Sequence, residues 1–156
     1  MTKTALVTGG TRGIGKAISL SLKAAGYTVV ANYAGNDEAA KAFTAETGIA
    51  AYKWSVADPD ACASGIAKVE AEVGPIDILI NNAGITKDNL FMRMKDEEWD
   101  DVIQVNLSAS FRLARASLRG MMKRRWGRII SITSVVGTMG NPGQGNYAAT
   151  KAGLVG

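Results

Sequence analysis

Three residues near the end of the chain have the types and spacing needed for acid-base chemistry on a carbonyl group. Tyr147 and Lys151 are four residues apart, so on an α-helix their side chains project from one face. An ammonium beside a phenol favours the phenolate, and bringing a phenol pKa of about 10 to neutrality needs roughly 4 kcal/mol. Ser134 would reach the same pocket and donate a hydrogen bond to the carbonyl oxygen. Because Tyr and Lys also share this spacing by chance on many helices, the surrounding elements must decide.

A glycine-rich loop near the N-terminus is typical of nucleotide binding. The apolar run at residues 4–8 breaks into GGTRGIG, and residues 16–25 then carry apolar side chains at helical spacing. Gly9, Gly13 and Gly15 allow a tight turn that presents free N–H groups of a helix N-terminus to a pyrophosphate. The alternative is a plain strand-to-helix turn that needs positive φ. The position after the first strand of a βαβ unit favours the nucleotide site.

The end of the second predicted strand bears on the choice of cofactor. A site for NAD places Asp or Glu there to bind the ribose 2′-hydroxyl, but here the strand ends in Ala31-Asn32-Tyr33, and the next carboxylate is Asp37. Arg12, in the glycine loop, can instead face a 2′-phosphate, or it is a solvated loop charge. The pattern favours NADP.

Strands and helices alternate along the chain. Predicted strands cover residues 4–8, 27–33, 49–54, 77–80 and 128–133, and predicted helices cover 16–25, 36–47, 59–73 and 97–125, the last as one or two helices. Apolar strands that alternate with helices indicate a parallel sheet covered on both faces. We therefore predict one α/β domain over residues 1–156, a doubly wound, Rossmann-like parallel sheet with five visible strands.

The motif Asn81-Asn82-Ala83-Gly84 directly follows the fourth predicted strand. This is the carboxyl edge of the sheet, where open α/β sheets bind ligands. Asx residues beside small ones also form plain turns, so the motif alone leaves both interpretations open.

The composition excludes several classes of protein. The 156 residues contain no His and one Cys, Cys62, so we predict no metal site, no His-based triad and no internal disulfide, and we interpret Cys62 as structural. The net charge is +4, and its one basic cluster is short, so no nucleic-acid partner is predicted. No apolar run approaches the roughly 18 residues of a membrane span, and no secretory pattern is seen. We therefore expect a cytoplasmic protein without a membrane partner.

Taken together, the motifs resemble a known family. TGGTRGIG, NNAG, and a Ser followed thirteen residues later by YAATK are similar to the short-chain dehydrogenase/reductase family, over all 156 residues. Within it, NNAGITKDNLFMRM and NYAATKAGLVG resemble 3-oxoacyl-acyl-carrier-protein reductases, and the segment from YAGND to NNAGITKD resembles acetoacetyl-CoA reductases. The resemblance implies NADPH-dependent reduction of a 3-oxoacyl thioester, carried by CoA or acyl carrier protein, to the 3-hydroxyacyl thioester.

The resemblance also implies roles for individual residues. Tyr147 would be the proton donor, Lys151 its partner and a ribose ligand, and Ser134 the group that binds the substrate carbonyl. Asn106 matches a helix-interior Asn that holds a water in a proton relay. Lys123, Arg124, Arg125 and Arg128 resemble a patch that receives an acidic carrier protein, although a solvated helix end complementing the helix dipole explains them equally well.

The implied ligand contacts extend over most of the chain. Asp88 and Gln144 match positions that face an acyl-CoA substrate, as do Ser134 and Tyr147. Ser55 departs from the family pattern, which has Asp or Asn before the Val that contacts adenine, and this leaves the contact to the adenine amine open. The implied cofactor contacts are Gly9, Gly10, Thr11, Arg12, Gly13, Ile14, Gly15, Tyr33, Ser55, Val56, Asn82, Ala83, Gly84, Ile85, Tyr147 and Lys151.

The extent of the chain leads to a last expectation. A six-stranded dinucleotide fold needs one more strand, whereas this sequence shows five and stops within the predicted helix of Tyr147 and Lys151. We expect a truncated reductase without its C-terminal strands, which binds NADP weakly and turns over slowly or not at all, and whose full-length form is a homo-oligomer. The alternative is a catalytically silent NADP-binding or assembly module.

Overall fold

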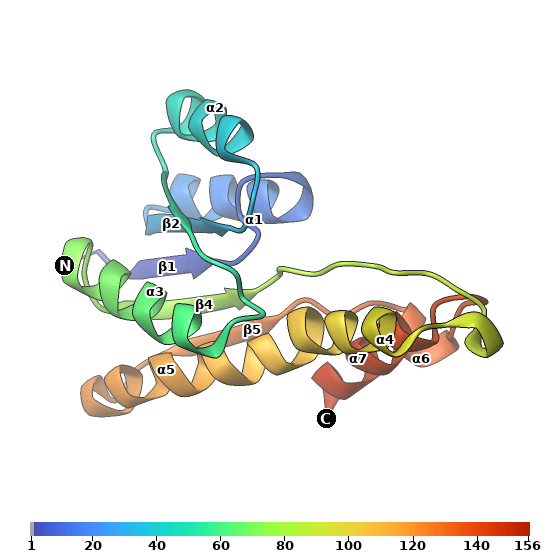
Figure 1. Cartoon of the computed structure of the whole chain (residues 1–156). Helices are drawn as coiled ribbons and strands as arrows, with labels where there is room; N and C mark the ends of the chain where they lie inside the picture. Colours follow the sequence, from blue (N-terminus) through green and yellow to red (C-terminus); the bar gives the residue numbers. More distant parts are fainter. Residues whose placement is uncertain (1) are drawn as a thin grey trace.

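The computed structural model describes residues 2–156 and is built around a parallel sheet (Figure 1). The strands are β1 (Thr4–Val7), β2 (Thr28–Tyr33), β3 (Ala50–Lys53), β4 (Ile76–Asn81) and β5 (Arg128–Ser131). They lie in the order β3-β2-β1-β4-β5, and each neighbouring pair is parallel. The chain leaves β1 first toward β2 and β3 and then crosses to β4 and β5, which opens a crevice at the carboxyl ends of the strands. The predicted doubly wound, Rossmann-like fold is confirmed.

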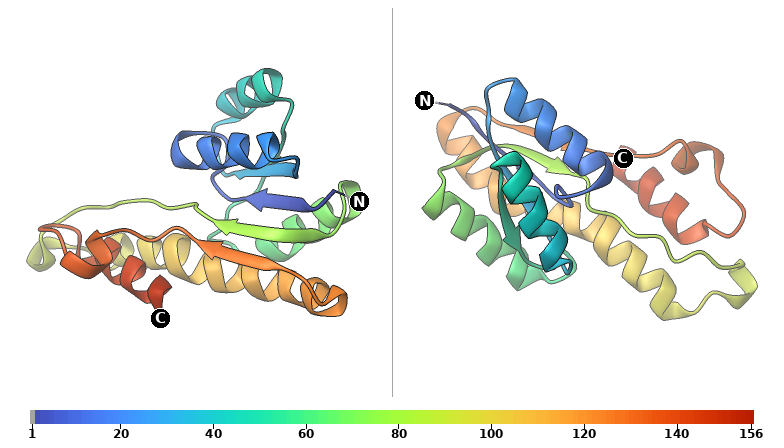
Figure 2. Two further views of the ribbon diagram at one scale, coloured as in Figure 1. Left: turned by 180° about the vertical axis from the view of Figure 1, so that it is seen from behind. Right: turned by 90° about the horizontal axis from the view of Figure 1, so that it is seen from above.

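Helices cover both faces of the sheet (Figures 1 and 2). One face packs against α1 (Gly13–Ala24) and α2 (Asp37–Thr47), and the other against α3 (Pro59–Glu72) and α5 (Ala109–Arg124). Successive strand residues point to opposite faces, so Leu6 joins the α3 and α5 side while Val7 joins the α1 and α2 side. Both faces are therefore apolar, as the sequence of the strands predicts.

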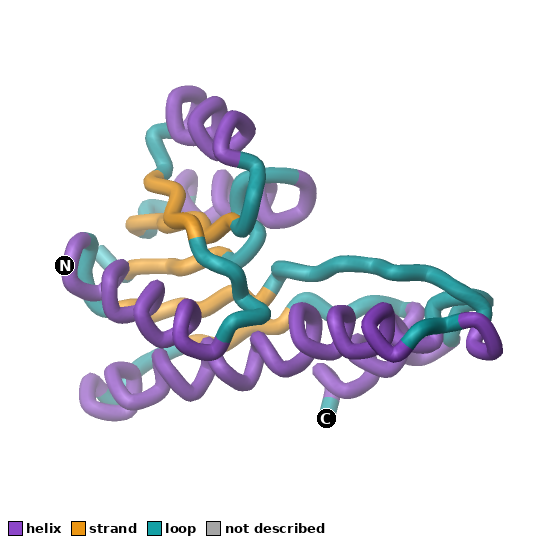
Figure 3. The backbone as a smooth tube through the Cα atoms, viewed as in Figure 1, coloured by secondary structure: helices purple, strands orange, loops and turns teal. Residues whose placement is uncertain are grey.

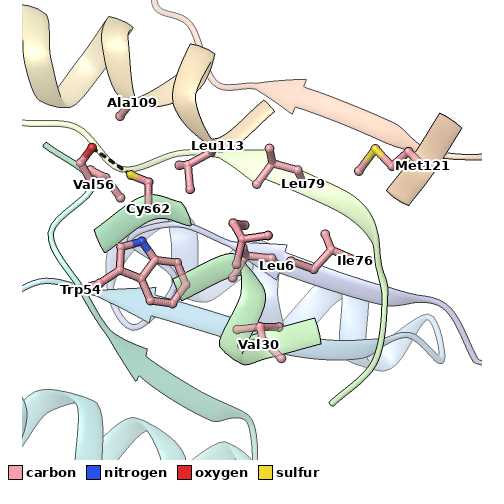
Figure 4. Packing of buried hydrophobic residues seen from close by; sticks show 12 residues of the cluster. Leu6, Val30, Trp54, Val56, Cys62, Ile76, Leu79, Ala109, Leu113 and Met121 are labelled. Carbon is pink, nitrogen blue, oxygen red and sulfur yellow. Dashed lines mark hydrogen bonds between the residues drawn. The ribbon is translucent and has the colours of Figure 1, made fainter. Parts of the chain in front are cut away.

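The core beneath α3 and α5 is closely packed (Figure 4). Leu6 and Leu79 from the sheet meet Leu113 from α5, and each is at most 1% exposed. Cys62 lies in the same cluster, where its thiol donates to the Val56 carbonyl at 3.3 Å (Figure 4). Burial raises the pKa of the Cys62 thiol, which suits the predicted structural role.

Local signals in the sequence set the ends of two helices. Asn36 caps α2 by accepting from the Ala39 N–H at 2.9 Å, and Gly48 ends that helix in the left-handed region with φ of 67°. Asp58 caps α3 in the same manner, and Pro59 occupies its first position. These boundaries match the predicted ones closely because caps are local in sequence.

The long predicted helix over residues 97–125 is interrupted. It consists of α4 (Asp96–Ile103), a π-helical turn η2 (Gln104–Ser108) and then α5. The sequence also did not predict the short helices η1 (Phe91–Arg93) and α6 (Val136–Met139), which precede α7 (Gly145–Val155). In Figure 3 a long connection runs from β4 to η1, and η1, α4, α6 and α7 gather beyond the carboxyl ends of the strands.

No helix in the described part of the chain is long and apolar enough to cross a membrane.

Strand β5 forms one edge of the sheet. It pairs with β4 alone among the described strands, and Ile129 and Ile130 are 38% and 47% exposed. The other edge strand is β3. The crevice at the carboxyl ends of the strands lies between these two edge strands.

Candidate active site

A cleft of about 540 Å³ opens where β1 to β4 end. It extends from the ends of β2 and β3, across the glycine loop, to the segment that follows β4. The structure brings together these predicted cofactor residues: Gly9, Thr11, Arg12, Gly13, Ile14, Gly15, Tyr33, Ser55, Val56, Asn82, Ala83, Gly84 and Ile85. The sequence did not predict these further lining residues, most of which adjoin predicted ones: Asn32, Ala34, Gly35, Asn36, Ala39 and Val105.

The glycine loop forms the floor of this cleft. Helix α1 begins at Gly13, three residues before the predicted start at Lys16, so the second half of the loop is its first turn. Arg12 is the N-cap residue, and its side chain makes no cap bond. The N–H groups of the first turn therefore receive no hydrogen bond from the Arg12 side chain. Gly15 packs so closely that a Cβ there would lie 2.1 Å from the Gly9 carbonyl oxygen. Free N–H groups beside a surface without side chains fit the pyrophosphate of a dinucleotide.

Gly10 is the predicted cofactor residue of this loop that does not line the cleft. Its N–H donates to the Asn32 carbonyl at 3.1 Å, and its carbonyl accepts from the Ser19 hydroxyl at 3.1 Å. A Cβ at Gly10 would lie 2.7 Å from the Val7 carbonyl oxygen. Gly10 therefore holds the loop against β2 and α1, and its lack of a side chain serves packing.

Asn82 connects the glycine loop to the end of β4. Its side-chain amide donates to the carbonyls of Thr8 and Gly9 at 3.0 and 3.3 Å. The Thr8 hydroxyl in turn accepts from the N–H groups of Asn82 and Ala83, both at 3.0 Å. The sequence left a plain turn and a ligand contact as alternatives. In the structure the Asn82 side chain fixes one wall of the cleft to its floor, and Asn82, Ala83 and Gly84 line the cleft, so the ligand contact stays a prediction.

Arg12 is the one charged residue among the described residues that line the cleft. It is exposed and forms no ion pair within residues 2–156. Asp37, the first carboxylate after β2, is 2.9 Å from the Lys53 ammonium and accepts from the Tyr33 hydroxyl at 3.1 Å. These bonds lower the pKa of Asp37 and keep it ionised and engaged. The cleft thus presents a guanidinium and no carboxylate.

The Tyr and Lys pair lies on α7, beside the end of β5. The Lys151 ammonium is 5.5 Å from the centroid of the Tyr147 ring and donates to the Ile132 carbonyl at 2.8 Å. Ile132 is two residues before Ser134, so this bond anchors the pair close to the Ser134 backbone. The Ser134 hydroxyl accepts from the Val136 N–H at 3.2 Å, and a hydroxyl that accepts can still donate its own hydrogen.

Lys151 is a buried cation, only 5% exposed. Among the described residues it has no carboxylate partner, and burial lowers its pKa from the usual 10.5. An unpaired buried charge costs stability, and such a cost is typical of a group kept for function.

We expect the pH dependence of stability to report this burial. Because the folded pKa of Lys151 is below its unfolded value of 10.5, the unfolded chain binds the proton more tightly between the two. Between the folded and the unfolded pKa of Lys151, the free energy of unfolding should therefore increase with pH. At pH values below the folded pKa, the cost of burying the charged ammonium does not change with pH. Urea unfolding of wild type and Lys151→Met at several pH values measures the difference, since both chains share every other titrating group. If the stability of wild type and that of Lys151→Met changed with pH in the same way, the buried charge would be contradicted. Lys123→Met is the control, because Lys123 is exposed.

Asn106 lies in the π-helical turn and is 2% exposed. Its side-chain oxygen accepts from the Ile85 N–H at 2.8 Å, and its amide donates to the Ile85 carbonyl at 2.9 Å. The side chain thus pairs with the segment after β4 as a neighbouring strand would. The Asn106 oxygen accepts one hydrogen bond there and has a second lone pair, so the relay role of Asn106 stays a prediction.

Asn146 is a buried residue of this region that the sequence did not predict. Its amide donates to the carbonyls of Lys87 and Glu98 at 2.9 and 3.1 Å, and its oxygen accepts from the Tyr147 N–H at 2.8 Å. It fixes the start of α7 to α4 and to the loop after β4. The sequence signal was weak, since Asn near a helix N-terminus is common.

Two of the predicted substrate residues, Asp88 and Gln144, contact one another. The Gln144 amide is 3.2 Å from each carboxylate oxygen of Asp88, and the Asn89 N–H donates to the Gly143 carbonyl at 2.9 Å. Asp88 and Gln144 therefore lie together at the edge formed by the start of α7 and the loop after β4.

The basic cluster at the end of α5 has partly structural roles. Arg124 is 3.3 Å from an Asp77 carboxylate oxygen and donates to the Ile76 carbonyl at 2.7 Å, which ties α5 to β4. Arg128 lies over the Trp126 ring, 5.1 Å from its centroid. Arg125 and Lys123 are exposed without such partners among the described residues.

The parallel sheet and the glycine loop are typical of a dinucleotide-dependent oxidoreductase, and comparison with known proteins agrees on that class. The family model described as short chain dehydrogenase matches residues 3–156, so the chain belongs to the short-chain dehydrogenase family. It is 58% identical over 156 residues to an acetoacetyl-CoA reductase of Shinella zoogloeoides, covering 100% of this chain and 65% of the relative. It is 55% identical to the 3-oxoacyl-[acyl-carrier-protein] reductase of Escherichia coli (strain K12), covering 99% of this chain and 64% of the relative. The chain thus spans just under two thirds of the length of these relatives.

Proposed function

We propose that the chain provides the cofactor site and catalytic residues of an NADPH-dependent reductase that converts 3-oxoacyl thioesters to 3-hydroxyacyl thioesters. The observation that carries this proposal is the bond from Lys151 to the Ile132 carbonyl, because it brings α7 to the strand end that leads into Ser134. The names of the relatives divide between CoA and acyl-carrier-protein substrates, and the proposal covers the thioester class that they share.

The residues have separate tasks in this reaction. NADPH, when bound, supplies the hydride to the ketone carbon. The Ser134 hydroxyl donates a hydrogen bond to the ketone oxygen and orients it, and the Tyr147 hydroxyl gives that oxygen its proton. The Lys151 ammonium stabilises the phenolate that forms on Tyr147 after proton transfer. The hydrogen bond from the Lys151 ammonium to the Ile132 carbonyl keeps the ammonium in place. The first turn of α1 and the glycine loop would hold the pyrophosphate, and Arg12 the 2′-phosphate.

The direct test is loss of NADPH absorbance when acetoacetyl-CoA is added to the 156-residue chain. Turnover that depends on both NADPH and the thioester supports the proposal. We expect a slow rate, because the chain spans 64–65% of the length of the relatives named above. A chain that binds NADPH but never oxidises it would favour a silent NADP-binding module.

Arg12→Gln is expected to weaken NADPH binding and to leave NADH binding unchanged. A lost bond between a guanidinium and a phosphate corresponds to about 1.5–3 kcal/mol, or roughly a tenfold to hundredfold rise in the Kd for NADPH. NADH lacks the 2′-phosphate, so the ratio of the two constants measures the contact by fluorescence titration.

Arg119→Gln is the matched control, because Arg119 lies on α5 and does not line the cleft. It removes the same charge and should leave both dissociation constants at their wild-type values. If Arg12→Gln weakened the binding of NADPH and of NADH equally, Arg12 would not contact the 2′-phosphate.

A further inference from the structure

Asp37 is the carboxylate closest in sequence to the end of β2, and it lies beside the cleft. It occupies the first position of α2, and both the preceding Asn36 and Tyr33, at the end of β2, line the cleft. In dinucleotide-binding folds the ribose of the adenosine half lies at this end of the second strand. A carboxylate there binds a 2′-hydroxyl and repels a 2′-phosphate, whose charge is about −1.5 to −2 at neutral pH. A free Asp37 carboxylate would therefore oppose the binding of NADPH.

Both oxygens of the Asp37 carboxylate are engaged. One is 2.9 Å from the Lys53 ammonium, and the other accepts from the Tyr33 hydroxyl at 3.1 Å. Tyr33 and Lys53 are paired residues of β2 and β3, so their side chains leave the sheet on the same face. This is the face that α2 covers, since Ala31, two residues before Tyr33, belongs to the core on that side. The start of α2 thus brings Asp37 against both side chains.

Lys53 also balances the charge of Asp37. The hydrogen bonds from Lys53 and Tyr33 lower the pKa of Asp37, so the carboxylate is ionised at neutral pH and its charge has to be balanced by a cation. The next charged residues of α2, Glu38 and Lys41, pair with each other at 3.0 Å and add no net charge. With Asp37 balanced by Lys53, the charge that faces a ligand at this end of the cleft is that of Arg12.

We propose that Lys53 determines the choice of cofactor by holding and neutralising Asp37, so that a 2′-phosphate is accepted at the end of β2. Lys53 does not line the cleft, so it acts through Asp37 as a positioning residue. The inference rests on the proposed function, because it requires that the cleft binds a nicotinamide dinucleotide. The role of Lys53 differs from that of Arg12: Arg12 attracts the phosphate, whereas Lys53 removes a repulsion.

The experiment measures the Kd of NADPH and of NADH by fluorescence titration at about 0.05 M salt, where charges are weakly screened. Lys53→Gln leaves the Asp37 carboxylate charged and without its cation. The Kd for NADPH should rise by about threefold to tenfold, because the carboxylate then repels the 2′-phosphate. The Kd for NADH should stay the same or fall, because Asp37 can accept from the 2′-hydroxyl. The ratio of two constants for one protein is insensitive to a loss of stability.

Two further variants separate this mechanism from the mere loss of a nearby positive charge. Combining Lys53→Gln with Asp37→Asn removes both charges, so the ratio of the two constants should return to within about twofold of the wild-type ratio. If Lys53 acted only by attracting the phosphate, the loss would persist in the double variant. Lys68→Gln is the matched control, because Lys68 is an exposed lysine of α3 that does not line the cleft. It should leave the ratio unchanged.

A wild-type ratio in Lys53→Gln would overturn the inference, and so would a reduced preference for NADPH that the double variant retains. Either result leaves the proposed function intact, since the wild-type chain still binds NADPH in preference to NADH. A chain that binds NADH as tightly as NADPH, or that binds neither dinucleotide, contradicts the proposed cofactor and this inference together.

Discussion

Replacing Tyr147 with Phe should abolish reduction of acetoacetyl-CoA and leave NADPH binding intact. The change removes one hydroxyl, which is the proposed proton donor beside Lys151, whose ammonium is 5.5 Å from the ring centroid. A positioned proton donor contributes about a hundredfold to ten-thousandfold to a rate, so at least a hundredfold loss is expected. NADPH oxidation gives the rate, and fluorescence titration gives the Kd of the cofactor.

Tyr52→Phe is the matched control for this prediction. The Tyr52 hydroxyl donates to Glu72 at 2.8 Å, between β3 and α3, and does not line the cleft. Its loss should leave the rate unchanged. Equal and measurable rates in wild type and Tyr147→Phe would show that the proton comes from another group. If both are inert and both bind NADPH, the chain is a binding module.

Gly15→Ala should destroy the cofactor site. The added Cβ would lie 2.1 Å from the Gly9 carbonyl oxygen and 2.6 Å from the Asn82 amide, and the first of these neighbours is backbone. The loop must therefore move, at a cost of about 3 kcal/mol in the free energy of unfolding. Displaced N–H groups should also raise the Kd for NADPH by at least about tenfold. Urea unfolding and fluorescence titration measure the two effects.

Gly35→Ala separates this steric effect from the general effect of replacing glycine. Gly35 has negative φ and no atom within 4 Å of the added Cβ, so the change should alter stability by at most about 1 kcal/mol. Wild-type stability and NADPH affinity in Gly15→Ala would mean that the loop is not packed as the structure has it.

Features that depend on neighbours in sequence could be predicted. The apolar runs of the strands, the caps of α2 and α3, the glycine loop and the Tyr147 to Lys151 spacing are all local patterns. They were sufficient for the parallel fold. The predicted cofactor contacts between Gly9 and Ile85 came largely from the family resemblance, and all of them except Gly10 line the cleft.

Contacts between distant residues could not be predicted. The bond of Asn82 to Thr8, of Asn106 to Ile85 and of Asn146 to Glu98 each join residues that are far apart in the chain. An Asn side chain gives no sign of its partner, because its amide suits turns, caps and backbone pairing alike. The π-helical turn at Gln104–Ser108 could not be predicted for the same reason. Asn106 lies in this turn, and its side chain pairs with a segment about twenty residues earlier in the chain.

The Asn82 amide has a further consequence for how a nucleotide would associate. Its bonds to Thr8 and Gly9 hold the glycine loop, the proposed phosphate site, in place before any ligand arrives. The conformational entropy of that loop is thus lost during folding and is not subtracted from the affinity. Association should then resemble docking into a preformed receptor, with little backbone rearrangement in the loop.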